Sequence, residues 1–170
     1  MSDTSFKPVR TIRTTSPSST KTLGVRLGEI CRPGDIICLN GDLGAGKTTL
    51  TQAIAIGAGV DSREYVSSPT FAVLHEYKGK ITLYHMDFYR LSDEEEIISM
   101  GLDDFFYLSG VTVIEWSDRA GNIMPDTCLR VDMTILAENS RSISFSSQDN
   151  EWRRRISQLF DDKVSNTEND

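Results

Sequence analysis

The segment from Gly41 to Thr48 constrains this chain more than any other part of its sequence. It reads Gly-Asp-Leu-Gly-Ala-Gly-Lys-Thr and matches, at every fixed position, the pattern GxxxxGK followed by Ser or Thr. A nearly continuous apolar run of strand length, 35–40, comes before it, and residues with helical spacing, 48–58, come after it. A strand, a glycine-rich loop and a helix in this order predict an α/β domain of the P-loop NTPase kind.

The residue types of this loop indicate what it can hold. Its glycines let the backbone curl so that N–H groups face inward, and the positive end of the following helix points to the same place. Lys47 can reach the β- and γ-phosphates of a nucleotide, and the Thr48 hydroxyl can ligate magnesium. We therefore expect ATP and Mg2+ here, although a plain glycine-rich turn with a surface lysine is the alternative. The expected nucleotide contacts are Asp42, Leu43, Gly44, Ala45, Gly46, Lys47, Thr48 and Thr49.

Two acidic residues follow strand-like runs elsewhere in the chain. Glu115 ends Val-Thr-Val-Ile-Glu, the apolar-run-then-acid pattern of a Walker B strand, and Asp87 ends the preceding run in the same way. Ligands of α/β sheets bind at the carboxyl ends of the strands, where both acids are expected. We assign Glu115 to the magnesium shell, and Lys47, Asp87 and Glu115 as candidate catalytic residues. Structural carboxylates are the alternative.

Other polar or aromatic features leave two interpretations open. Trp116 can stack on a ligand or fill the rim of the sheet. The turn-forming segment 67–70 can be a nucleotide-sensing switch loop or a plain loop. His75 and His85 are too few for a metal cluster, so a structural role is favoured for His85. The basic run 153–155 points in different directions on a helix, which favours a solvated face.

The rest of the chain alternates helices and strands. The expected helices are 48–58, 94–100, 152–160 and one that is capped by Ser18 or Ser19 and ends before Pro33. A capping box that begins at Ser92 precedes the helix 94–100. The expected strands are 35–40, 70–77, 80–86, 111–115, 128–136 and 142–146. The runs 70–77 and 80–86 follow one another closely and predict a hairpin, whose strands must be antiparallel. We therefore predict a three-layer domain with a mixed, mostly parallel sheet. It should span 9–160, with flexible tails at 1–8 and 161–170.

Composition excludes several classes of protein. The chain has 170 residues, enough for one core, and a net charge of −7, which disfavours direct contact with a nucleic-acid backbone. Its three cysteines have no CxxC spacing, so we expect buried thiols in a reducing compartment rather than disulfides or a zinc site. No signal-peptide-like or membrane-length apolar stretch is present. A cytoplasmic protein without a membrane partner is expected.

Four motifs, in their order and spacing, resemble the TsaE (YjeE) family of bacterial tRNA-modification ATPases. They are GDLGAGKTT at 41–49, SPTF at 68–71, YHMDFYRL at 84–91 and IEW at 114–116. The match runs from about residue 20 to residue 145.

The resemblance implies an ATPase needed to make N6-threonylcarbamoyladenosine (t6A) at position 37 of tRNAs that read ANN codons. It would act with the TsaB and TsaD proteins, which carry the transfer chemistry, and would meet tRNA only indirectly. Lys47 and the loop amides would bind phosphates, Thr48 and Glu115 the magnesium, and Asp87 would serve the hydrolytic site. Trp116 would lie at the nucleotide, with 68–71 as the switch-like loop. The adenine would lie partly against 14–19.

Two other functions compete with this interpretation. A P-loop small-molecule kinase needs an acceptor pocket and an arginine-rich lid, and the sequence shows neither, although Arg90 and Arg119 could be recruited. A guanine-nucleotide switch normally carries Asn-Lys-x-Asp, which this chain lacks. Neither an arginine finger nor a water-orienting glutamine stands out, so hydrolysis by the chain alone should be slow.

Overall fold

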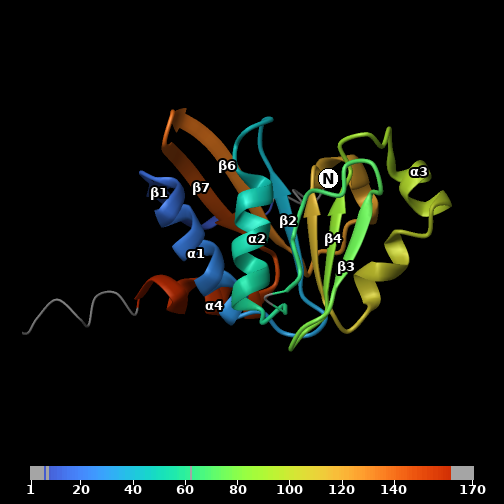
Figure 1. Ribbon diagram of the computed structural model, residues 1–170, viewed down its shortest axis with the longest axis horizontal. Helices are drawn as coiled ribbons and strands as arrows, with labels where there is room; N and C mark the ends of the chain where they lie inside the picture. Colours follow the sequence, from blue (N-terminus) through green and yellow to red (C-terminus); the bar gives the residue numbers. More distant parts are fainter. Residues whose placement is uncertain (1–5, 7, 62, 162–170) are drawn as a thin grey trace, which may run out of the picture.

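The computed structural model describes residues 6, 8–61 and 63–161 of the chain (Figure 1). The predicted tails lie outside the described residues except at Phe6, Pro8 and Asp161. Pro8 is the first residue of a strand, and Asp161 is the last residue of a helix. Among the described residues, no helix is long and apolar enough to cross a membrane.

A single mixed sheet of seven strands runs through the described residues. The strands are β1 (Pro8–Thr14), β2 (Ile36–Asn40), β3 (Leu74–Tyr77), β4 (Leu83–Asp87), β5 (Val111–Glu115), β6 (Leu129–Ala137) and β7 (Ser140–Ser146). Their spatial order is β1-β7-β6-β2-β5-β4-β3. The four central strands, β6, β2, β5 and β4, are parallel.

Antiparallel pairs extend this centre at both ends. β3 pairs with β4, and β7 pairs with both β6 and β1. The mixed sheet is therefore as predicted, but parallel pairing is confined to its centre. For the β6–β7 pair the physical reason is loop length, because a tight turn joins the two strands and a short connection allows only an antiparallel neighbour.

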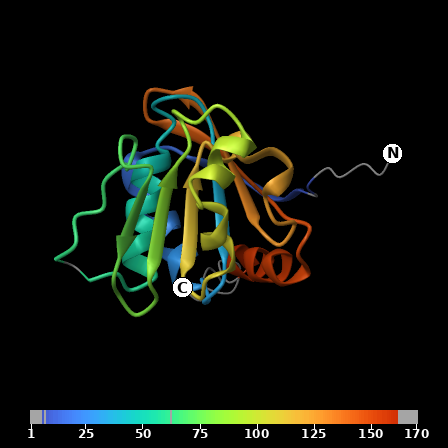
Figure 2. The same cartoon turned by 90° about the vertical axis from the view of Figure 1, so that its right-hand side faces the viewer.

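Helices cover both faces of the sheet and give the predicted three layers. On one face, α1 (Pro17–Glu29), α2 (Lys47–Gly57) and α4 (Asn150–Asp161) share a core with Leu39 and Val113. On the other face, α3 (Glu94–Ser99) and the 3-10 segments η1 (Asp103–Tyr107) and η2 (Ser117–Ile123) share a core with Cys38 and Ile114. Figure 2 turns the molecule so that α3 and η1, in yellow-green and yellow, lie in front of the sheet. Since both faces are covered, β2 and β5 are buried at every position.

The helices α1 and α2 lie side by side in very close contact (Figures 1 and 2). A Cβ atom added to Gly57 would lie 2.0 Å from the carbonyl oxygen of Val25, and one added to Gly28 would lie 2.1 Å from that of Ile54. The two glycines thus permit an approach that any side chain would prevent. This contact fixes α2, and with it the loop that precedes α2.

Two helix caps lie one or more residues away from their predicted positions. The cap of α1 is Ser16 rather than Ser18 or Ser19, because Pro17 occupies the first helical position and Ser16 and Ser19 exchange hydrogen bonds. The cap of α3 is Asp93, whose side chain accepts from the Glu96 amide at 3.0 Å. An aspartate caps as well as a serine, so sequence alone did not separate the two registers.

Sequence analysis missed β1 and overextended β3. β1 is a half-exposed edge strand with charged residues among its apolar ones, so its pattern is weak. β3 begins at Leu74 rather than at residue 70, because Val73 adopts a left-handed backbone with φ of 67°. The predicted buried thiols are confirmed, since Cys31, Cys38 and Cys128 are all buried and free.

The substitution Gly57→Ala tests the close contact of α1 with α2. We expect it to lower the free energy of unfolding by roughly 1–3 kcal/mol, because the new methyl group forces the helices apart. Urea denaturation measures this change. The control is Ile56→Ala on the exposed side of the same helix, where Ile56 is 68% exposed. Equal stability of the two variants would contradict the prediction.

Candidate functional site

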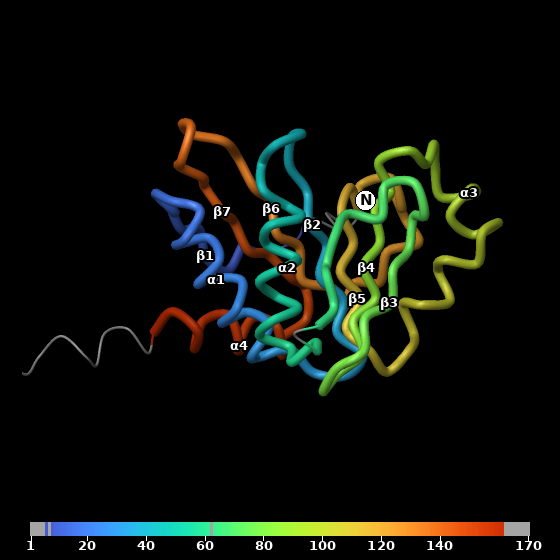
Figure 3. The backbone as a smooth tube through the Cα atoms, in the orientation of Figure 1, coloured from blue at the N-terminus to red at the C-terminus, as the bar shows by residue number. Residues whose placement is uncertain are grey.

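The loop of residues 41–46 connects the end of β2 to the start of α2, as the tube in Figure 3 shows. Gly41 has φ of 149°, and a Cβ there would lie 2.4 Å from the carbonyl oxygen of Met133. Gly46 is the N-cap of α2 with φ of 104°, and no side chain caps the helix. The first amides of α2 therefore open onto the loop, where an anion is favoured.

Lys47 is buried beneath this loop. Its ammonium group donates to the carbonyl oxygens of Gly41, at 2.6 Å, and Asp42, at 2.9 Å. Burial lowers the pKa of Lys47, while the negative charges of Glu115, Asp87 and Asp42 oppose this shift. The lysine thus supplies a positive charge inside the loop.

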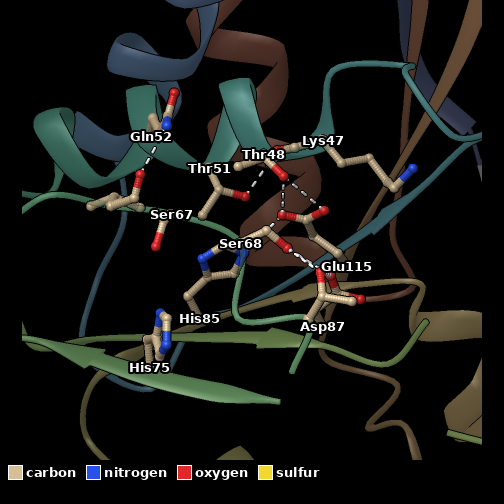
Figure 4. A network of polar contacts seen from close by, with 12 residues as sticks. Lys47, Thr48, Thr51, Gln52, Ser67, Ser68, His75, His85, Asp87 and Glu115 are labelled. Atoms are coloured by element: carbon tan, nitrogen blue, oxygen red, sulfur yellow. Dashed lines mark hydrogen bonds and ion pairs between the residues drawn. The ribbon is translucent and has the colours of Figure 1, made fainter. Parts of the chain in front are cut away.

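Thr48 and Glu115 are in direct contact. The Thr48 hydroxyl donates to Glu115 at 3.0 Å to Oε1 and 3.2 Å to Oε2 (Figure 4). Glu115 ends β5 and is 3% exposed. A hydroxyl and a carboxylate at this spacing are oxygen donors of the type that magnesium takes beside phosphate oxygens and water.

Asp87 lies next to Glu115, because the two residues are register partners at the ends of β4 and β5. Its Oδ2 accepts from Ser68 at 2.7 Å and from Thr70 at 2.9 Å, and its Oδ1 accepts from the Tyr89 amide at 2.9 Å. The segment 67–70 is therefore tied to the site through a buried carboxylate, which a plain surface loop would not be.

Trp116 follows Glu115 in a left-handed backbone conformation, with φ of 58°. Its ring lies 4.1 Å from the Lys47 ammonium and 5.0 Å from the Tyr89 ring, measured to ring centroids. The indole ring therefore covers the Lys47 ammonium and also forms part of the lining of the site. Trp116 thus lies at the rim of the site, and its stacking on a ligand stays a prediction.

One cavity of about 460 Å³ brings together the predicted site residues other than Asp42 and Ala45. Its lining includes Leu43, Gly44, Gly46, Lys47, Thr48, Thr49, Ser68, Asp87, Glu115 and Trp116. The structure therefore places Lys47, Asp87 and Glu115 at one site, although their catalytic roles stay predictions. Lys47 is the only cationic side chain among the described residues that line the cavity.

A second hollow of about 160 Å³ lies on the other side of the same loop. The loop residues Gly44 to Gly46 and the start of α1 line it, together with Asn139 and Arg141 from the β6–β7 hairpin. Ser16 and Pro17 lie within the segment expected near an adenine. Arg141 donates to the carbonyl oxygens of Ala45, at 2.9 Å, and Gly44, at 3.3 Å.

Arg141 and His85 contact the site but were not among the predicted site residues, and a structural role was favoured for His85. Arg141 lies outside every motif, so no sequence signal marks it. His85 is fully buried, and its Nε2 lies 2.8 Å from Glu115 Oε1. Its position two residues before Asp87, on the same face of a strand, was the available signal.

The basic run 153–155 lies on α4 and does not line the cavity. The predicted solvated face is wrong for Arg155, which is 6% exposed and pairs with Asp35 at 2.6 and 2.9 Å. The physical reason is that its helical position faces the core, while Arg154 faces outward toward Glu151. Among the described residues, no group of three or more His, Cys, Asp or Glu side chains is placed to hold a metal ion.

Comparisons with known proteins agree on one family. The family described as "Threonylcarbamoyl adenosine biosynthesis protein TsaE" matches residues 14–143. A "tRNA threonylcarbamoyladenosine biosynthesis protein TsaE" from Bacillus subtilis (strain 168) is 37% identical over 156 residues, covering 91% of this chain and 96% of that protein. The protein of the same name from Treponema pallidum (strain Nichols) is 36% identical, covering 76% and 94%.

A solved structure resembles the fold over almost its whole length. The crystal structure of YdiB from Bacillus subtilis superposes with a TM-score of 0.79 and 31% sequence identity. The superposition covers 94% of this chain and 98% of YdiB.

The substitution Asp87→Ala tests how the loop of residues 67–70 is held. Hydrogen bonds to a charged group are worth roughly 1.5–3 kcal/mol each. We therefore expect hydrogen exchange in this loop to accelerate by about 10- to 100-fold, measured by mass spectrometry, with exchange in β2 unchanged. The control Asp93→Ala, which removes the cap of α3, should loosen only that helix. Unchanged exchange at 67–70 in Asp87→Ala would contradict the assignment.

Proposed function

Because the chain belongs to the TsaE family of tRNA threonylcarbamoyladenosine biosynthesis proteins, we propose that it is the ATP-hydrolysing subunit of that pathway. The product of the pathway would be t6A at position 37 of tRNAs that read ANN codons. TsaB and TsaD would be its partners, in the cytoplasm. The observation that carries the proposal is the convergence of Lys47, Thr48, Glu115 and Asp87 on one cavity at the N-terminus of α2.

The geometry supports a nucleotide laid across the loop of residues 41–46. Phosphates in the larger cavity would meet the Lys47 ammonium and the first amides of α2. The nucleoside would lie in the smaller hollow between the start of α1 and Asn139. Arg141 supports this arrangement because it donates hydrogen bonds to the carbonyl oxygens of Ala45 and Gly44. The N–H groups of the loop then stay available for the phosphates.

The donor set also fits a magnesium ion. Thr48 and Glu115 would hold it, in keeping with the preference of Mg2+ for one or two protein oxygens beside phosphate and water. When bound, the ion would neutralise negative charge that develops on the phosphates. Lys47 would turn from the carbonyls of Gly41 and Asp42 toward the phosphates, a short movement within the same loop.

Asp87 would orient the attacking water. Its Oδ2 is occupied by Ser68 and Thr70, whereas its Oδ1 accepts only from the Tyr89 amide among the hydrogen bonds of the described residues. Oδ1 therefore retains a lone pair that can accept from a water molecule. Any rearrangement of Ser68 or Thr70 would also move this carboxylate, which couples the loop to hydrolysis.

The charge of the site supports dependence on partner proteins. Lys47 is the only cation that lines the cavity in the described part of the chain, and phosphoryl transfer normally needs further positive charge on the transferred group. Arg90, the candidate for a kinase lid, lies over the Phe71 ring at 4.0 Å to its centroid. The net charge of −7 favours a protein partner over direct tRNA contact.

Phosphate release from ATP and from GTP, with and without the TsaB and TsaD proteins, tests the proposed function. We expect slow release from ATP by the chain alone, and release at least about tenfold faster with both partners, since missing charge stabilisation can be worth several orders of magnitude. Transfer of phosphate to a metabolite would instead establish the kinase alternative. A rate that the partners leave unchanged would contradict the proposed assembly.

The substitutions Thr48→Ala and Glu115→Gln test the magnesium ligands. Each should lower Mg2+-dependent hydrolysis by at least about 100-fold, because stabilisation of charge by a bound metal is worth several kcal/mol. Steady-state phosphate release measures the loss. Ser99→Ala, in α3 on the opposite face of the sheet, serves as the control. Undiminished turnover in both variants would refute the assigned roles.

A further inference from the structure

His85 is completely buried beside the proposed magnesium ligand. Its Nε2 lies 2.8 Å from Glu115 Oε1, the oxygen that also accepts from Thr48 at 3.0 Å. Figure 4 shows the imidazole beneath α2, pointing toward the Glu115 carboxylate. The roles proposed for Lys47, Thr48, Glu115 and Asp87 do not involve this contact.

The strand register explains why His85 reaches Glu115. Side chains alternate between the two faces of a strand, so His85 and Asp87 share one face of β4. Val113 is the register partner of His85 on β5, and Glu115 follows it by two residues on the same face. The three polar side chains therefore project together toward α2, while Met86 and Ile114 belong to the core on the other face.

The hydrogen-bonding pattern assigns the direction of this contact. A carboxylate accepts only, so Nε2 must carry the hydrogen and donate it to Glu115. The other ring nitrogen, Nδ1, is buried without a hydrogen-bond partner in the described structure. A buried histidine that leaves one nitrogen unpaired is a poor choice for stability alone, since an apolar side chain of similar size would avoid that cost.

We propose that His85 is a positioning residue that holds Glu115 Oε1, so that Oε2 stays aimed at the magnesium ion when the Thr48 hydroxyl turns to ligate it. The inference rests on the proposed function, because it assumes that Glu115 binds Mg2+. Groups that orient metal ligands in this way are typically worth 10–100-fold in metal affinity. His85 therefore affects the affinity for Mg2+ rather than the affinity for the nucleotide.

The test compares His85→Leu, which removes the donor, with His85→Gln, whose longer side-chain amide can still donate near the position of Nε2. Titration calorimetry of the full chain with ADP measures nucleotide affinity in EDTA, and titration of the ADP complex with MgCl2 measures metal affinity. We expect His85→Leu to weaken Mg2+ binding by about 10- to 100-fold, with ADP binding in EDTA unchanged. His85→Gln should restore Mg2+ affinity to within about threefold of the unmodified chain.

The matched control is His75→Leu. His75 is the register partner of His85 on β3, and its Nδ1 contacts the Tyr77 hydroxyl rather than Glu115. Its loss should leave Mg2+ affinity unchanged. If His85→Leu fails to fold, as judged by circular dichroism, His85→Asn replaces it, because its shorter amide falls short of Glu115.

Three outcomes would overturn the inference. The first is unchanged Mg2+ affinity in a folded His85→Leu or His85→Asn, and the second is a loss in His85→Gln equal to that in these variants, which would indicate a packing role. The third is an unmodified chain that binds ADP without any Mg2+ dependence. The third result would also contradict the proposed function, whereas the first two results would contradict only the role of His85.

Discussion

Two carboxylates buried side by side at the ends of β4 and β5 are the constraint on which the rest of this structure depends. Asp87 and Glu115 are register partners, and each is only 3% exposed. Their negative charges therefore repel one another where little water can screen them. Their burial is tolerated because hydroxyl and amide donors surround them and the Lys47 ammonium lies nearby. The hydroxyl donors come from α2 and from the segment 67–70, so the acids organise the elements around them.

The sheet supplies the rigidity that such a site requires. β2 and β5 are buried on both faces, which fixes the start of the 41–46 loop and the position of Glu115 together. The close contact of α1 with α2 at Gly28 and Gly57 then fixes the position of α2 on the sheet. A site held by packed strands and helices keeps its donors oriented before any ligand arrives, which lowers the cost of binding.

The TsaE family links this fold to tRNA t6A biosynthesis, and the net charge of −7 disfavours direct contact with the tRNA backbone. The contacts of Ser68 and Thr70 with Asp87 offer a physical route by which a partner could influence hydrolysis. A partner that moves this loop would change the hydrogen bonds of the carboxylate we assign to the attacking water.

The sequence by itself determined the features that depend on local chemistry. The pattern from Gly41 to Thr48 specifies its loop, because glycine conformation and helix initiation are local, and an apolar run ending in Glu115 specifies a buried strand with an acid at its end. Only the tertiary structure decided that His85 donates to Glu115, that Arg141 supports the loop and that β1 pairs with β7. Each of these contacts joins residues that are far apart in the chain, and the strand register and side-chain packing that bring them together cannot be read from a local pattern of residues. Alternation along the strand marked only the face that His85 shares with Asp87.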